Sequence, residues 1–202
     1  VNEQTEVALL LAGPVFLAML GLAPWVIELL YSSKFAEAAV VLRWQIMGDI
    51  LKVVSFPLGF VILAAGNGRT FMLTETLSIV VYAILVWIGL PYLGLQATGV
   101  GFLIMYIVLL PLVYWLARYR TGFRWARYVF AKGAALMMVG SLVAIVAAKN
   151  RWAGAALGVV AAGIFGLYAL ERLAHVTVSS GLLMRLAITY RKLILKFGVR
   201  NE

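Results

Sequence analysis

Residues 76–117, TLSIVVYAILVWIGLPYLGLQATGVGFLIMYIVLLPLVYWLA, form the longest run without a charged side chain in this sequence. A helix needs about 20 residues to cross the roughly 30 Å hydrocarbon core of a bilayer. This run is twice that length, so it predicts two transmembrane helices. The segment PYLGLQ, residues 91–96, divides the run by its turn chemistry. We therefore expect spans near residues 71–90 and 98–117.

Four further apolar runs have the length of a membrane span. They lie near residues 7–27, 40–65, 128–148 and 152–170. The short alternating segments typical of β-barrel strands do not occur in the sequence. The pattern predicts an all-α, polytopic membrane protein with six transmembrane helices.

The composition excludes several classes of protein. Of 202 residues, 64% are hydrophobic and 12% are charged, whereas soluble domains have about 45–50% and about 25%. The sequence has no cysteine, and His175 alone cannot form a multi-histidine metal site. No common catalytic or phosphate-binding motif is present, and the predicted outer loops are too short for a catalytic domain. We expect no catalytic residues, no metal, no cofactor and no enzyme activity.

The positive charge follows the predicted topology. The net charge is +9. With six spans both ends lie on one side, which carries twelve Lys and Arg residues against three on the other. Because positive loops stay in the cytoplasm, we expect both ends of the segment to be cytoplasmic. The charge indicates topology and anionic lipid, not nucleic acid.

The two ends of the sequence lead to separate expectations. The chain enters its first span soon after Val1, without an initiator Met, so we expect it to be the back part of a longer polypeptide. Residues 173–202 carry several basic side chains, and from Leu182 many apolar residues fall on one helical face. We expect an interfacial helix that binds anionic lipid on the cytoplasmic leaflet. A basic tail that only enforces topology is the alternative.

Asp49 and Lys52 are charged residues near the middle of the span at 40–65. An isolated charge there costs roughly 2.5–3.5 kcal/mol on insertion scales, so lipid contact is excluded. Gln45 and Phe56 share a helical face with both residues. One interpretation is an internal Asp49–Lys52 ion pair that locks two helices together. The other is a cavity wall that meets a charged substrate or a coupling ion.

Arg43 and Glu75 are further candidate site residues. Arg43 lies nearer the outer end of its span and either extends to the membrane surface or contributes to the site. Glu75 begins the third span, where an acid complements the helix dipole or serves as a proton or cation site.

Small residues recur four apart in the last two spans and predict close helix packing. They are Gly154, Gly158, Ala162 and Gly166 in one span, and Gly140, Ala144 and Ala148 in the other.

The string WQIMGDILK, residues 44–52, resembles the Wzx-type flippases, which are O-antigen and lipid-linked oligosaccharide translocases. The resemblance extends over about residues 1–120. It includes SKF at residues 33–35, Glu75, and the proline and glycines of residues 91–99. The WQxxGDxLK pattern is its specific part, because glycine-rich turns occur in many transporters.

The resemblance implies a fold of the multidrug/oligosaccharidyl-lipid/polysaccharide superfamily, with two six-helix bundles around a cavity. Residues 1–120 would be four helices of the second bundle, residues 121–172 an additional pair of a 14-helix transporter, and the first bundle would precede this segment. The implied substrate is an undecaprenyl-diphosphate-linked oligosaccharide, flipped across the bacterial inner membrane. Lys52 is the natural counter-charge for a diphosphate, with Arg43 and Gln45 as further substrate-binding residues. Asp49 and Glu75 would serve in coupling or ion pairing.

The main alternative is a cation-coupled exporter of small molecules from the same superfamily. In that case Asp49 and Glu75 would form the centre of the site, with Lys52 only as their partner. A membrane scaffold would explain the small-residue patterns but not charges at mid-membrane.

Overall fold

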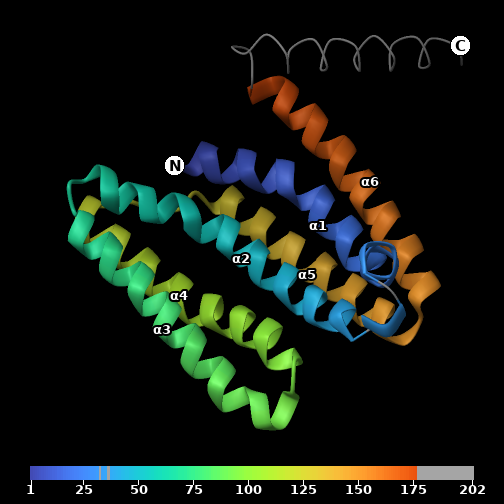
Figure 1. The fold of residues 1–202 in the computed structure, drawn as a ribbon. Helices are drawn as coiled ribbons and strands as arrows, with labels where there is room; N and C mark the ends of the chain where they lie inside the picture. The colour runs from blue at the N-terminus through green and yellow to red at the C-terminus, as the bar shows by residue number, and fades with distance from the viewer. Residues whose placement is uncertain (32, 36, 177–202) are drawn as a thin grey trace, which may run out of the picture.

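The computed structural model describes residues 1–31, 33–35 and 37–176, and these residues form long helices joined by short connections (Figure 1). The elements are α1 (Asn2–Leu30), the 3-10 helix η1 (Ser33–Phe35), α2 (Ala38–Ala64), α3 (Gly68–Leu93), α4 (Gln96–Thr121), α5 (Arg127–Lys149) and α6 (Arg151–Val176). All six α-helices are long and apolar enough to cross a membrane. The expected all-α polytopic architecture is confirmed. The predicted interfacial helix from Leu182 onward lies outside the described residues.

The helices extend past the apolar runs that predicted them. The clearest difference is between the third and fourth spans, where a turn over residues 91–96 was expected. Pro91 instead lies in the last turn of α3, and only Gly94 and Leu95 separate α3 from α4. Gly94 has a φ of +54°, a backbone conformation that glycine adopts at little cost.

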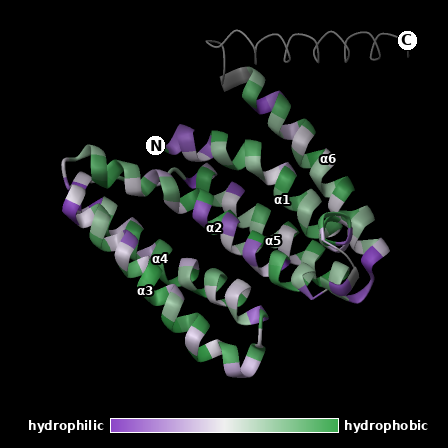
Figure 2. Cartoon of the chain, in the orientation of Figure 1, coloured by the Kyte–Doolittle hydropathy of each residue, from purple (hydrophilic) through white to green (hydrophobic). Residues whose placement is uncertain are grey.

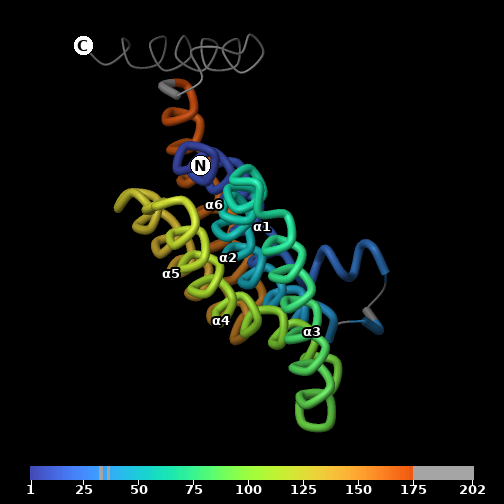
Figure 3. The backbone as a smooth tube through the Cα atoms, turned by 90° about the vertical axis from the view of Figure 1, so that its left-hand side faces the viewer, coloured from blue at the N-terminus to red at the C-terminus, as the bar shows by residue number. Residues whose placement is uncertain are grey.

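Helices α1 and α2 lie side by side at the centre of the bundle (Figures 1 and 3). Helix α6 covers α1, α4 covers α2, and α5 packs against α1, α2 and α6. Helix α3 is at the edge and contacts α4 and, less extensively, α2. The α3–α4 hairpin therefore attaches to the rest of the molecule mainly through α4.

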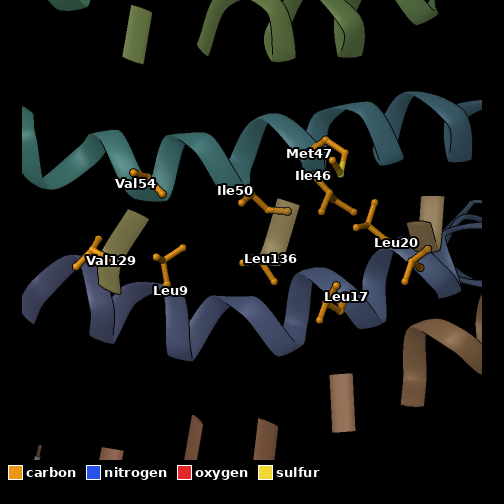
Figure 4. Close-up of a cluster of buried hydrophobic side chains, with 10 residues drawn as sticks. Leu9, Leu17, Leu20, Ile46, Met47, Ile50, Val54, Val129 and Leu136 are labelled. Atoms are coloured by element: carbon orange, nitrogen blue, oxygen red, sulfur yellow. The ribbon is translucent and has the colours of Figure 1, made fainter. Parts of the chain in front are cut away.

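The largest apolar core lies where α1, α2 and α5 meet (Figure 4). Leu9, Leu17 and Leu20 of α1 belong to one cluster with Ile46 and Ile50 of α2. Met47 and Val54 of α2 and Val129, Leu136 and Val143 of α5 complete the cluster.

Glycines bring α6 against α1 and α5. A Cβ atom on Gly158 would lie 2.8 Å from the Cα of Gly21 and 2.9 Å from the carbonyl oxygen of Leu17. Gly154 meets Ala147 of α5 in the same way. The predicted close packing by small residues is confirmed for this part of α6.

Large apolar side chains are exposed on all six α-helices. Hydrophilic residues gather near the N-terminus and at several helix connections (Figure 2). On α3 only Thr74 is buried, while Trp87 is 78% exposed and Ile79 is 68% exposed. Such a surface is expected for helices that contact lipid or further transmembrane helices.

Candidate functional site

The face of α2 that carries Gln45, Asp49 and Lys52 is accessible in the structure. Lys52 and Gln45 are exposed and Asp49 is half-buried, although all three lie away from the ends of a long apolar helix. Phe56 continues the same face and is 60% exposed. Lys52 is near the midpoint of α2, so its ammonium group lies far from both helix ends. This charge placement requires a wet or protein-lined space in a membrane.

Lys52 and Asp49 do not form the ion pair that one interpretation expected. The two residues interact electrostatically, but none of the ion pairs among the described residues joins them. The Lys52 ammonium lies instead 5.8 Å from the centre of the Phe102 ring of α4. The lysine is therefore held at the α2–α4 boundary by an aromatic face and keeps its capacity to bind an anion.

A small cavity brings Lys52 and Glu75 together. It lies between α2, α3 and α4 and has a volume of about 90 Å³. Its polar lining comes from Lys52, Ser55, Thr74, Glu75, Ser78 and Tyr106. The three smaller hydroxyls donate to backbone carbonyls of their own helices. Lys52, Glu75 and Tyr106 are thus the groups that can meet a ligand.

Tyr106 is a site residue that the sequence reasoning missed. It lies in an uncharged run, where a tyrosine gives no signal of its own. In the structure Tyr106 is close enough to Glu75 and Asp49 to interact electrostatically with both. Ser78, which also lines the cavity, follows Glu75 by three residues, and this i, i+3 spacing is a local signal that could have placed Ser78 beside Glu75.

The cavity has room for a few water molecules or one small ionic group. A water molecule occupies about 30 Å³ in the liquid, so the cavity volume corresponds to about three waters. A cation and an acid face this space together, so it suits either an anion at Lys52 or a cation at Glu75. The rest of any large ligand must lie along the open face of α2.

Arg43 is separated from the other candidate residues. It is only 9% exposed and lines a different cavity, between α2 and α5. The spacing of nine residues from Lys52 places it on the opposite side of α2. Gln45 and Asp49 lie on the Lys52 side but do not line the small cavity. The structure thus brings Lys52 and Glu75 together and leaves Arg43 out.

A second charged cluster lies near the end of the bundle where α1 begins. Glu6 of α1 is 4% exposed and accepts hydrogen bonds from Lys132 of α5 and from Arg172 of α6. The Arg172 Nε lies 3.1 Å from Glu6 Oε1. The Lys132 ammonium also contacts the rings of Tyr128 and Tyr168 at 5.6 and 5.5 Å. These fully partnered charges join three helices, which is a structural role.

Comparison with known proteins shows similarity to flippases. Over 87 residues, 43% of this chain, the sequence is 28% identical to the lipid III flippase of Escherichia coli (strain K12). The lipid III flippase of Shigella flexneri matches to the same extent. The match spans 21% of the length of each flippase. No family model and no solved structure matches the chain. The similarity is to a transporter of lipid, not to an enzyme.

Proposed function

We propose that this chain is part of a flippase that turns undecaprenyl-diphosphate-linked oligosaccharides across the bacterial inner membrane by alternating access. The product would serve polysaccharide synthesis of the O-antigen type. Lys52 carries the proposal, because it is a mid-helix cation that is exposed and has no carboxylate at ion-pair distance among the described residues. The similarity to lipid III flippases supports the same class of activity.

Lys52 is assigned to the diphosphate for a chemical reason. Phosphate oxygens are strong acceptors, and a charge-assisted hydrogen bond gains strength where water is partly excluded. Gln45 extends the same face of α2 and can donate to further oxygens. Asp49 and Glu75 are assigned to coupling, since each lies close to Tyr106 and neither is ion-paired within the described residues. Arg43 is not assigned to this site because it faces α5.

The open face of α2 leaves room for the remainder of the transporter. We assign residues 1–120 to the second bundle and residues 121–172 to an additional helix pair, as the resemblance implies. The first bundle would cover the Lys52 side and close a central cavity. Both ends of the segment are assigned to the cytoplasm from the distribution of Lys and Arg.

The test is complementation of a flippase-deficient strain by variants of the full-length protein. Lys52→Ala and the double variant Lys52→Ala/Asp49→Asn are both expected to abolish surface polysaccharide. Lys52→Arg is expected to retain part of it, because the charge remains while its geometry changes. Lys149→Ala is the control, since this exposed lysine lies at the end of α5 and outside the cavity. Membrane levels are compared by immunoblot.

Two outcomes would contradict the proposal. Normal polysaccharide from the double variant would make Lys52 a mere partner of Asp49. An active Lys52→Ala variant beside an inactive Glu75→Gln variant would indicate the cation-coupled exporter, in which the acids form the centre.

A further inference from the structure

An apolar groove follows the seam between α2 and α5, on the side of α2 opposite Lys52. It has a volume of about 390 Å³, within the range of small-molecule sites, and is lined by Arg43, Trp44, Met47, Ala144, Ile145 and Ala148 among others. We call this cavity the α2–α5 groove. A separate cavity of about 200 Å³ lies further along the seam and shares no lining residue with it.

Arg43 is buried in this groove without a partner. Only 9% of the residue is exposed, and its Nε is buried with no hydrogen-bond acceptor. The ion pairs among the described residues do not include it. A buried charge with no counter-ion costs several kcal/mol, so the arrangement calls for an anion that is not part of these residues.

The position of Arg43 fits a lipid headgroup. Arg43 is the sixth residue of α2, roughly 8 Å from the start of the helix. It therefore lies near the membrane face, on the side of the α1–α2 and α5–α6 connections, where lipid phosphates are found. A guanidinium binds a phosphate through two parallel hydrogen bonds. A single cation also matches the single negative charge of a phosphodiester.

The rest of the groove fits an acyl chain. Beyond Arg43 the lining is apolar, with Met47, Ala144 and Ile145 leading toward the centre of the bundle. The Ser141 hydroxyl donates a hydrogen bond to the carbonyl of Met137, so its donor is already satisfied without a ligand. Ala144 and Ala148 belong to the small-residue pattern of α5, and here their size leaves space along α2. A ligand with an anionic headgroup and an apolar chain fits both the Arg43 end and the apolar part of the groove.

We propose that the α2–α5 groove binds one anionic phospholipid, with its phosphate on Arg43 and an acyl chain along Met47, Ala144 and Ile145. The bound lipid supplies the missing counter-charge and fills the seam between α2 and α5. The site is independent of the proposed flippase cavity, because Arg43 and Lys52 are on opposite sides of α2.

The experiment measures lipid binding by the purified full-length protein in neutral detergent. Phosphatidylglycerol and phosphatidylcholine are titrated separately, with native mass spectrometry and thermal unfolding as readouts. We expect the wild-type protein to bind phosphatidylglycerol preferentially and to gain thermal stability from it. Arg43→Gln should weaken that binding about tenfold or more, because a charge-assisted bond is lost. Inorganic phosphate alone should give no stabilisation, because it has no chain to fill the groove.

Further variants keep the test decisive. Lys149→Gln is the matched control at the same membrane face, and it should bind like the wild type. Arg43→Lys keeps the charge and should retain part of the preference. Ala144→Phe keeps Arg43 but blocks the groove, so it should lose binding even if Arg43→Gln fails to fold.

Four results would overturn the proposal. One is equal binding of both lipids by the wild type, and another is unchanged phosphatidylglycerol binding in both Arg43→Gln and Ala144→Phe. The third is recovery of a polyprenyl-linked lipid from the groove in place of a phospholipid. An equal loss in Lys149→Gln would likewise reduce the effect to general surface attraction.

Discussion

The α1–α5–α6 side of the molecule and the α2–α3–α4 side differ in whether their charged side chains are paired. On the first side, Glu6 is buried and accepts hydrogen bonds from two cations on two other helices. On the second, Lys52 and Glu75 face a shared cavity without a close ion pair among the described residues. The outermost helix of each side also packs differently, since α6 meets α1 through glycines whereas α3 buries only Thr74. Helices α2 and α4 themselves meet closely at Gly99.

The comparison shows how to separate stabilising charges from functional ones in a membrane bundle. A partnered, buried charge holds helices together, and its loss is felt as instability. An unpartnered charge at a cavity adds no such link between helices and is a candidate for ligand binding. The two sides should therefore respond to substitution through different measurements.

The largest loss of stability is expected from Glu6→Gln. This change leaves Lys132, whose side chain is only 14% exposed, without its carboxylate, and breaking a buried pair costs on the order of 3 kcal/mol. The full-length protein should unfold at a clearly lower temperature in detergent. Glu3→Gln is the control, because Glu3 is exposed in the first turn of the same helix. The double variant Glu6→Gln/Lys132→Met should recover part of the loss. No recovery would show that Lys132 is not the residue left unpaired.

A smaller loss is expected from Gly158→Ala. The added methyl group would meet backbone atoms of Gly21 and Leu17, and such overpacking costs about 1–3 kcal/mol. Gly163→Ala is the matched control on α6, because a Cβ there meets nothing within 4 Å. It should be neutral or stabilise by up to about 1 kcal/mol through helix propensity. Equal unfolding temperatures for the two variants would mean that the α1–α6 contact is looser than the structure shows.

The smallest effect is expected at the other end of α1, for Glu28→Gln. Glu28 and Arg151 form an ion pair of 3.5 Å, and both side chains are more than a third exposed. Exposed pairs contribute about 0–1 kcal/mol, and Arg151 keeps its contacts with the rings of Trp25 and Trp152. The unfolding temperature should hardly change. A loss as large as that of Glu6→Gln would remove the distinction between buried and exposed pairs on α1.

The sequence predicted the helices well because apolar runs report directly on membrane spans. It also placed Lys52 and Glu75 among the candidates, since charge in an apolar run is costly. The sequence could not show which neighbouring helix Arg43 faces, because this depends on how the helices assemble. The Glu6 cluster was missed for the same reason: its partners are 126 and 166 residues away, and no local pattern joins them.

The contacts of α1 with α6 have a consequence for biosynthesis. Chains are made from the N-terminus, so α1 enters the membrane long before Gly158 and Arg172 exist. Until then the surface of α1 around Gly21 is not covered by α6, and the Glu6 carboxylate lacks its Arg172 partner. Maturation of α1 must therefore wait for α6, and the first helix of this segment is among the last to reach its final surroundings.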